Sequence, residues 1–218
     1  MNAVDLLACA YRPLIALADD LDDLRGWLPT LLPGWCVRDL VFHLAADCQR
    51  ALVALATPAD GAPDTDEISY WSHWQPGTEY AQAGLRGTRI IASAWTSVRG
   101  PAGLHAETAR AVLVAAGRVQ PGDVVATQGH RLTVASLLRT LAVEAAVHHL
   151  DLAPVLPEPP VAEALAEVRH VLDGLLGEPA PSSWDDARYA QVGTGRAELN
   201  VAEREQLGPL ADRFPLFG

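Results

Sequence analysis

Glu144 and His148 stand four residues apart in a segment, residues 134–152, whose apolar side chains recur at helical spacing. On a helix that turns by about 100° per residue, His148 falls close to the centre of the apolar stripe and Glu144 about 60° to one side. A carboxylate and an imidazole therefore face the protein interior one turn apart. Two such side chains can share one metal ion. They can equally form an internal hydrogen bond at the rim of the core.

A third ligand is available from His43, in a second helical pattern over residues 37–56. His43 lies at the border of that apolar stripe, about 60° from Leu40. Two imidazoles and one carboxylate would leave coordination positions open for water or substrate, as in catalytic metal sites. A histidine at such a border also fits a structural role, so the residue pattern alone leaves both interpretations open.

Two stretches of the chain resemble the motifs of a known family. Residues 34–44, GWCVRDLVFHL, resemble the GW(T/S)VRDLxxHL stretch of mycothiol-dependent maleylpyruvate isomerase N-terminal domains. Residues 144–152, EAAVHHLDL, resemble their ExxxHxxDL stretch. These domains belong to the DinB-like superfamily of four-helix, metal-binding bundles. The resemblance covers about residues 1–153, with both stretches in the family's order and each on an expected helix.

The resemblance implies that His43, Glu144 and His148 are the ligands of a divalent metal, usually zinc. It also implies that the open coordination position receives the thiol of a low-molecular-weight cofactor such as mycothiol. Coordination would lower the pKa of that thiol and create a metal-bound thiolate. The implied function is S-transfer to an electrophilic substrate, or its isomerisation. The alternatives are a non-catalytic module that binds a metal or small molecule, and a metal-dependent hydrolase.

The chain departs from the family pattern at two places. Cys36 stands where the family usually has Thr or Ser, which are better helix N-caps than Cys. We expect Cys36 to be a partly buried, inert thiol, although a redox thiol or an extra ligand is the alternative. The second departure is the short segment, residues 161–218, where the isomerases carry a larger C-terminal domain. This difference argues against maleylpyruvate itself as the substrate.

Further residues could contact a ligand or line a pocket. Asp47 follows His43 by one helical turn and could accept a hydrogen bond from that imidazole, although pairing with Arg50 or solvation fits equally. Arg188 and Arg196 could hold a carboxylate, or could be ordinary surface charges.

A long irregular segment, residues 57–77, could either wall a pocket or pack on the bundle as a lid. Its aromatic and imidazole side chains are those of Tyr70, Trp71, His73 and Trp74. In the later motif, His149 points about 100° away from His148, so we expect it at the surface or an interface. We expect Asp151 to be a structural hydrogen-bonding residue.

Composition excludes several classes of function. The 16 basic residues are all Arg, against 27 Asp and Glu, which gives a formal charge of -11. A field of that sign disfavours nucleic acids and anionic membranes. The lack of Lys excludes Schiff-base chemistry. No apolar run reaches the roughly 20 residues that span a bilayer. Three cysteines without CxxC spacing indicate reduced thiols and a cytoplasmic protein.

The elements that must position these residues are mainly helical. Helical patterns cover residues 3–28, 37–56, 79–98, 102–117 and 134–152, with a short hairpin over residues 123–133. A Pro-rich linker, residues 154–160, precedes a helix over residues 161–176. We expect a small hairpin around Gly193 and Gly195, and a last helix near residues 201–207.

The sequence therefore predicts a mainly α protein with two parts. A DinB-like four-helix bundle over residues 1–153 would bind the metal. A small α+β extension over residues 161–218 would pack on it. An Ala-rich bundle with a Trp-bearing loop could also form a homodimer.

Overall fold

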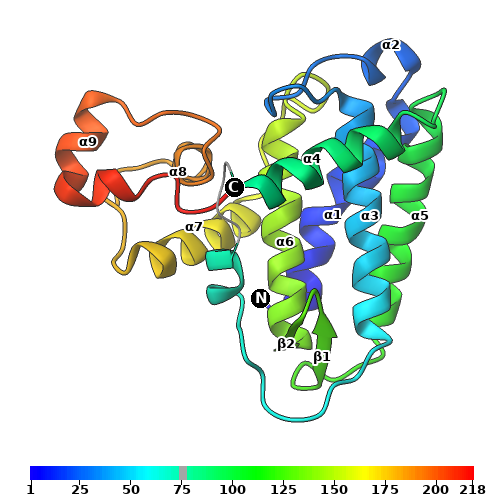
Figure 1. Cartoon of the computed structure of the whole chain (residues 1–218), viewed down its shortest axis with the longest axis horizontal. Helices are drawn as coiled ribbons and strands as arrows, with labels where there is room; N and C mark the ends of the chain where they lie inside the picture. The colour runs from blue at the N-terminus through cyan, green and yellow to red at the C-terminus, as the bar shows by residue number, and fades with distance from the viewer. Residues whose placement is uncertain (74–77) are drawn as a thin grey trace.

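Four long helices form the body of the molecule in the computed structural model, which describes residues 1–73 and 78–218 (Figure 1). Each helix packs against two others around one core: α1 on α5 and α6, and α3 on the same two helices. Their bounds are Ala3–Asp20 for α1, Val37–Leu55 for α3, Arg99–Ala116 for α5 and Val134–Asp151 for α6. The predicted mainly α bundle is confirmed.

The helix α6 occupies the centre of the fold because it is apolar on nearly every side. It packs against α1, α3 and two helices of the C-terminal segment. Leu138 and Ala142 are fully buried within it. Its first turn is capped by Thr133, whose hydroxyl accepts a hydrogen bond from the backbone N–H of Ser136 at 3.0 Å. Two of the three residues predicted to bind a metal therefore stand on a rigid, buried element.

Three predicted helix boundaries are wrong. The first pattern, residues 3–28, divides into α1 and the short α2 (Asp23–Gly26). The pattern over residues 79–98 ends early as α4 (Glu79–Ala92), and α5 then begins at Arg99 rather than at residue 102. Pro101 falls in the first turn of α5, where its missing N–H has no intrahelical partner to lose. Gly100 lies in the same turn. Only glycine fits there, because the ring of Trp95 occupies the space that a Cβ would need.

A two-stranded hairpin at the start of α6 agrees with the prediction. Strand β1 (Val124–Thr127) pairs antiparallel with β2 (His130–Thr133). Gln128 and Gly129, at the turn, both have positive φ angles, 51° and 84°. Such angles are typical of a two-residue hairpin turn. The long segment that follows α3 lies beside this hairpin and includes the 3₁₀ helix η1 (Ser69–His73).

The C-terminal segment is helical. It contains α7 (Ala162–Leu176), α8 (Asp186–Gly193), α9 (Val201–Leu207) and the 3₁₀ helix η2 (Gly208–Arg213). The hairpin predicted around Gly193 and Gly195 is wrong, since residues 178–218 contain no strand. The helix α8 continues through Gly193, which packs against Leu172 of α7. The chain then turns at Gly195, whose φ of +74° is in the left-handed region.

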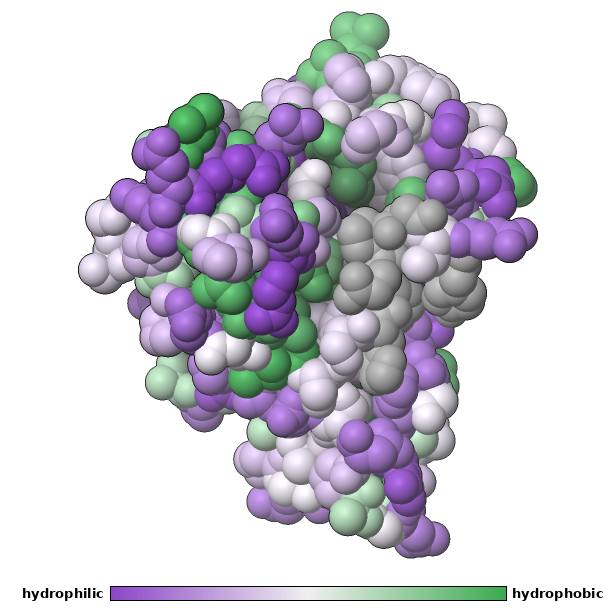
Figure 2. All heavy atoms as spheres, turned by 60° about the vertical axis from the view of Figure 1, so that its left-hand side comes forward, coloured by the Kyte–Doolittle hydropathy of each residue, from purple (hydrophilic) through white to green (hydrophobic). Residues whose placement is uncertain are grey.

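The surface carries both polar and apolar side chains. Hydrophilic residues cover much of the face that Figure 2 presents, and apolar residues stand out at the top, the end of the molecule that carries α2. Leu24 and Trp27 are 84% and 58% exposed there. Within residues 1–73 and 78–218, no helix combines the length and the apolar character needed to cross a membrane.

Candidate metal centre

Helices α3 and α6 bring together the three residues predicted as metal ligands. The Nε2 atom of His43 lies 3.0 Å from Oε1 of Glu144, and Nε2 of His148 lies 3.2 Å from the same oxygen. The three donor atoms all lie within 4.8 Å of one another. Ligand atoms around a tetrahedral zinc ion are about 3.4 Å apart. This group of residues, which we call the triad, is therefore compact enough to hold one divalent cation.

The triad is open on one side. The side chains of His43 and Glu144 are 23% and 25% exposed, whereas that of His148 is 7% exposed. A cation bound to these three side chains would keep a coordination position on the solvent side. Such an arrangement suits a site that binds a further small molecule.

The first family-like motif fixes the start of α3 and so the position of His43. Asp39 accepts a hydrogen bond from the backbone N–H of Cys36 at 3.3 Å. It also forms an ion pair with Arg38 at 2.9 Å. Arg38 in turn stacks over the ring of Trp27 at 4.4 Å. The ring of Trp35 meets the ring of His43 edge-on, with 5.4 Å between the centroids. The motif thus orders the helix terminus in addition to supplying His43.

Cys36 caps the helix without joining the triad. It is half-buried, and burial raises the pKa of its thiol. A thiol with a raised pKa is a poor nucleophile at neutral pH. This property agrees with the expected inert role.

The second motif orients His148 through Asp151, one turn further along α6. Oδ2 of Asp151 lies 2.9 Å from Nδ1 of His148, and Arg196 contacts both carboxylate oxygens at 3.3 and 3.2 Å. Burial alone would raise the pKa of Asp151, but His148 and Arg196 lower it below its ordinary value. An ionised carboxylate can accept a hydrogen bond but cannot donate one. Nδ1 therefore carries the hydrogen, and Nε2 is the atom available to a metal.

Opposite charges in the triad determine its protonation. Burial would lower the pKa of His148, but Glu144 and Asp151 outweigh burial and raise it to about 9. Burial would raise the pKa of Glu144, but His148 and His43 hold it well below its ordinary value. A cation bound at Nε2 of His148 would take the place of a proton. The carboxylates around His148 therefore favour a positive charge at its Nε2, whether a proton or a metal ion supplies it.

Asp47 lies beside the triad, as the i+4 spacing predicts. Its Oδ2 is 3.2 Å from Nε2 of His43, and within the described residues no ion pair joins it to Arg50. Burial, followed by the effect of Glu144, raises the pKa of Asp47 to about 6, although His43 opposes the shift. The buried Oδ2 has no hydrogen-bond partner among residues 1–73 and 78–218. An additional acidic oxygen next to the triad also favours a cation.

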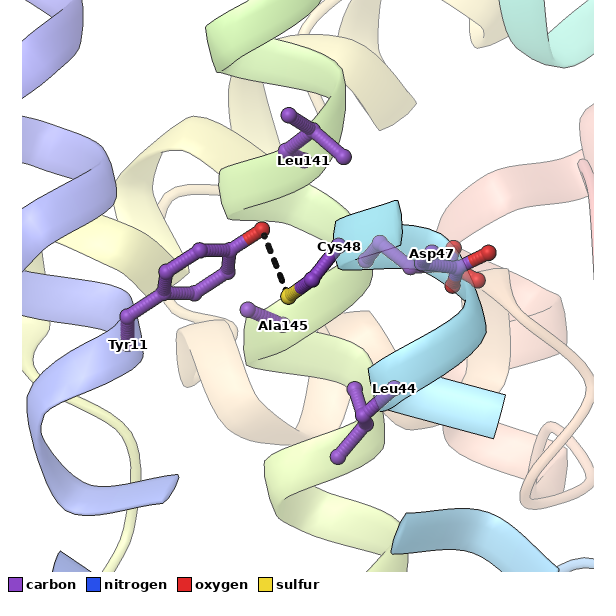
Figure 3. A pocket seen from close by; sticks show the side chains of 7 residues that line it. Tyr11, Leu44, Asp47, Cys48, Leu141 and Ala145 are labelled. Carbon is purple, nitrogen blue, oxygen red and sulfur yellow. Dashed lines mark hydrogen bonds between the residues drawn. The ribbon is translucent and has the colours of Figure 1, made fainter. Parts of the chain in front are cut away.

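A small cavity lies beside Asp47. In Figure 3 the Tyr11 hydroxyl and the Cys48 thiol, 3.6 Å apart, meet on one side of it, and the Asp47 carboxylate lies on the other. The cavity measures about 10 Å³, which is the space that one water molecule needs. It is lined by Tyr11, Leu44, Asp47, Cys48, Leu141, Glu144 and Ala145. A thiol cofactor could not fit here, so it would have to approach from the solvent side.

Among the described residues, the other predicted site side chains make their contacts elsewhere or, as for Arg196, reach the triad only through Asp151. Trp71, in η1, is buried and stacks on Phe217 with 4.5 Å between ring centroids. His73 ends the same 3₁₀ helix, and Trp74 lies outside the described residues. Arg188, in α8, pairs with Glu203 at 2.8 Å and not with the triad.

Of the two positions expected for His149, the structure excludes the surface. It is 3% exposed rather than at the surface, and its Nε2 donates a hydrogen bond to the carbonyl oxygen of Glu158 at 2.8 Å. Its ring therefore faces the linker that leads to α7. Of the contacts that the sequence analysis missed, the bond from His148 to Asp151 could have been found from the i+3 spacing on one helix. The bond from Arg196 carries no local signal.

Comparison with known proteins agrees with this geometry. A family model described as mycothiol maleylpyruvate isomerase N-terminal domain matches residues 7–153. The matched range contains the whole triad and Asp151, and it ends before α7. Searches of curated proteins and of solved structures gave no significant match.

Proposed function

Because the chain belongs to the mycothiol maleylpyruvate isomerase N-terminal domain family, we propose that it is a metal-dependent enzyme with a thiol cofactor. The thiol is mycothiol or a related low-molecular-weight thiol, used as a cofactor or co-substrate for S-transfer or isomerisation. The observation that carries this proposal is the convergence of the three donor atoms of His43, Glu144 and His148 within 4.8 Å.

The donor set favours zinc as the cation. Two imidazoles and one carboxylate with an open position form a common catalytic zinc site. When bound, such a cation lowers the pKa of a coordinated thiol and so supplies a thiolate nucleophile near neutral pH. The triad, Asp47 and Asp151 would together compensate the charge of the cation.

The protein residues would hold and orient the reactants. Glu144 and His43 border the open side, where the thiol and the electrophilic substrate would enter. Trp35 restricts the ring of His43 from the side. Since the chain has a formal charge of -11, an anionic substrate needs local positive charge, and the cation at the triad is the nearest source.

We also propose a two-part organisation for the chain. Residues 1–153 would form the metal-binding domain, and residues 161–218 an extension packed on it. The three free cysteines, of which Cys48 is buried, favour a reducing compartment such as the cytoplasm. A homodimer remains a prediction, which light scattering of the purified protein would test.

Metal content and thiol-dependent turnover test the proposal together. Elemental analysis of the purified protein should give about one divalent ion per chain. With mycothiol or another thiol and monochlorobimane as the electrophile, it should form the thiol conjugate. His148→Ala should lose both properties. His170→Ala is the matched control, because His170 is an exposed histidine on α7.

The outcomes separate the competing functions. Metal binding without turnover across a panel of thiols and electrophiles would favour a non-catalytic binding module. Ester or amide hydrolysis without added thiol would favour a metal-dependent hydrolase. If neither the wild type nor His148→Ala holds metal after reconstitution, the proposed function is wrong.

A further inference from the structure

Asp151 joins the triad to the C-terminal segment. Its side chain has no solvent exposure and accepts hydrogen bonds from His148 on one side and Arg196 on the other. Its backbone carbonyl accepts a further hydrogen bond, from the N–H of Leu31 at 3.1 Å. A carboxylate with fixed partners on all these sides can hold the imidazole of His148 in one orientation.

The backbone after α8 holds Arg196 in place. The N–H of Arg196 donates to the carbonyl of Gln191 at 2.8 Å, and its NH1 atom donates to the carbonyl of Thr194 at 2.7 Å. Gly195 makes this possible with its left-handed φ of +74°. The side chain of Arg196 is only 9% exposed. The guanidinium therefore cannot easily exchange Asp151 for water.

The contacts of Arg196 disagree with a role in holding a substrate carboxylate. Nε and NH2 donate to Asp151, and NH1 donates to Thr194. All three nitrogens are thus used inside the protein. The carboxylate that Arg196 holds belongs to the chain itself.

We propose that Arg196 is a positioning residue for the metal centre: it fixes Asp151, which fixes the orientation and tautomer of His148. The inference rests on the proposed function insofar as it requires a metal at the triad. Beyond that function, we infer that Arg196 sets the affinity and the coordination geometry of the metal site. Arg196 lies 43 residues beyond the end of the family match, at residue 153. The C-terminal segment would then be part of the metal site in this chain.

The physical reason is the cost of a buried charge. Without Arg196, Asp151 would lose the guanidinium that pairs with it in a site without solvent. Its position against Nδ1 of His148 would then no longer be fixed. Groups that orient a metal-bound histidine typically contribute about 10–100-fold to metal affinity. We expect an effect of that size from Arg196, although it does not touch the ion.

Cobalt(II) titration of the metal-free protein tests the inference. Cobalt(II) is a spectroscopic substitute for zinc, because its visible absorption reports coordination geometry. Arg196→Gln and Asp151→Asn should each weaken binding by about 10–100-fold and change the shape of the visible spectrum. Arg196→Lys keeps the charge but not the planar fork, so its affinity should lie between those of Arg196→Gln and the wild type.

Arg188→Gln is the matched control. Arg188 also lies in the C-terminal segment and donates two hydrogen bonds to one carboxylate, that of Glu203, but it does not contact the triad. Arg188→Gln should lower the free energy of unfolding as Arg196→Gln does, but it should leave the cobalt affinity and spectrum unchanged. Unfolding of each metal-free variant, followed by circular dichroism, shows whether stability alone accounts for any loss.

The results distinguish this inference from the proposed function. If the wild type binds no cobalt, the proposed function fails. If the wild type binds cobalt and folded Arg196→Gln or Arg196→Lys binds it equally well with the same spectrum, Arg196 is merely structural and the inference is wrong. Should Arg196→Gln not fold, Arg196→Lys and Asp151→Asn decide the question in the same way.

Discussion

The imidazole ring of His43 on α3 meets that of His148 on α6 nearly at a right angle, 86°, with 4.7 Å between the ring centroids. The rings come from segments more than 100 residues apart, so a cation between them would link the two helices. A ligand that binds only the folded state stabilises that state. The geometry of this histidine pair therefore has a consequence for stability as well as for chemistry.

Metal should stabilise the folded protein through the triad. At a free zinc concentration of 100 times Kd, the free energy of unfolding should rise by about 2.7 kcal/mol. Thermal unfolding with and without zinc measures the shift. His43→Ala should abolish it, whereas His170→Ala should keep it. An equal shift in His43→Ala would mean that zinc stabilises the protein at another place.

His105 should make the protein less stable in acid. It is buried on α5, and burial lowers its pKa to about 4 from the ordinary value of 6.5. The unfolded chain therefore binds a proton at His105 below about pH 6.5, whereas the folded chain binds it only below about pH 4. Stability should fall as the pH drops through this window, by up to about 3 kcal/mol from this residue.

Comparison with His105→Leu isolates this contribution. Leu replaces the imidazole with an apolar side chain, and Nε2 of His105 has no hydrogen-bond partner among the described residues to lose. Urea unfolding at several pH values should give a shallower loss in acid for His105→Leu than for the wild type. Equal slopes for the two proteins would contradict the prediction.

Gly100 should not tolerate a methyl group. A Cβ there would overlap a ring carbon of Trp95, so Gly100→Ala must displace the indole. We expect a loss of about 1–3 kcal/mol of stability. Gly103→Ala, in the same helix, is the control, because no atom lies within 4 Å of the new Cβ. That variant should be as stable as the wild type or up to about 1 kcal/mol more stable.

Cys36→Ser should strengthen the start of α3. Cys36 has the extended backbone of an N-cap, with φ of −92° and ψ of 170°, but sulfur is a weak acceptor. A hydroxyl should add about 0.5–1 kcal/mol of stability. Chemical denaturation measures the gain, with Cys9→Ser as the control for loss of a thiol. Metal affinity should stay the same, and a clear loss of it would indicate that Cys36 contributes to the site.

The sequence was most informative where contacts follow helix geometry. The i+4 relations of Glu144 to His148 and of His43 to Asp47 predicted which side chains share a face, and the structure brings them together. That His43 would meet the Glu144 and His148 pair came from the resemblance of both motifs to one family. Helical spacing alone cannot align two helices that are distant in the chain.

The C-terminal segment was the least predictable part. Gly193-Thr194-Gly195 has the composition of a hairpin turn, but Gly193 ends a helix because only a residue without a side chain fits against Leu172. The bond from Arg196 to Asp151 depends on that packing and on the turn at Gly195. Neither contact leaves a pattern in the local sequence.

The helix α6 carries Glu144, His148 and Asp151 within three turns. The rotation of this one helix about its axis therefore sets the direction of all three side chains. Insertion of a single residue after Glu144 would rotate the rest of the helix by about 100°. The same insertion would turn His148 away from His43 and Asp151 away from Arg196. Changes in chain length are therefore far less tolerable inside this helix than in the loops around it.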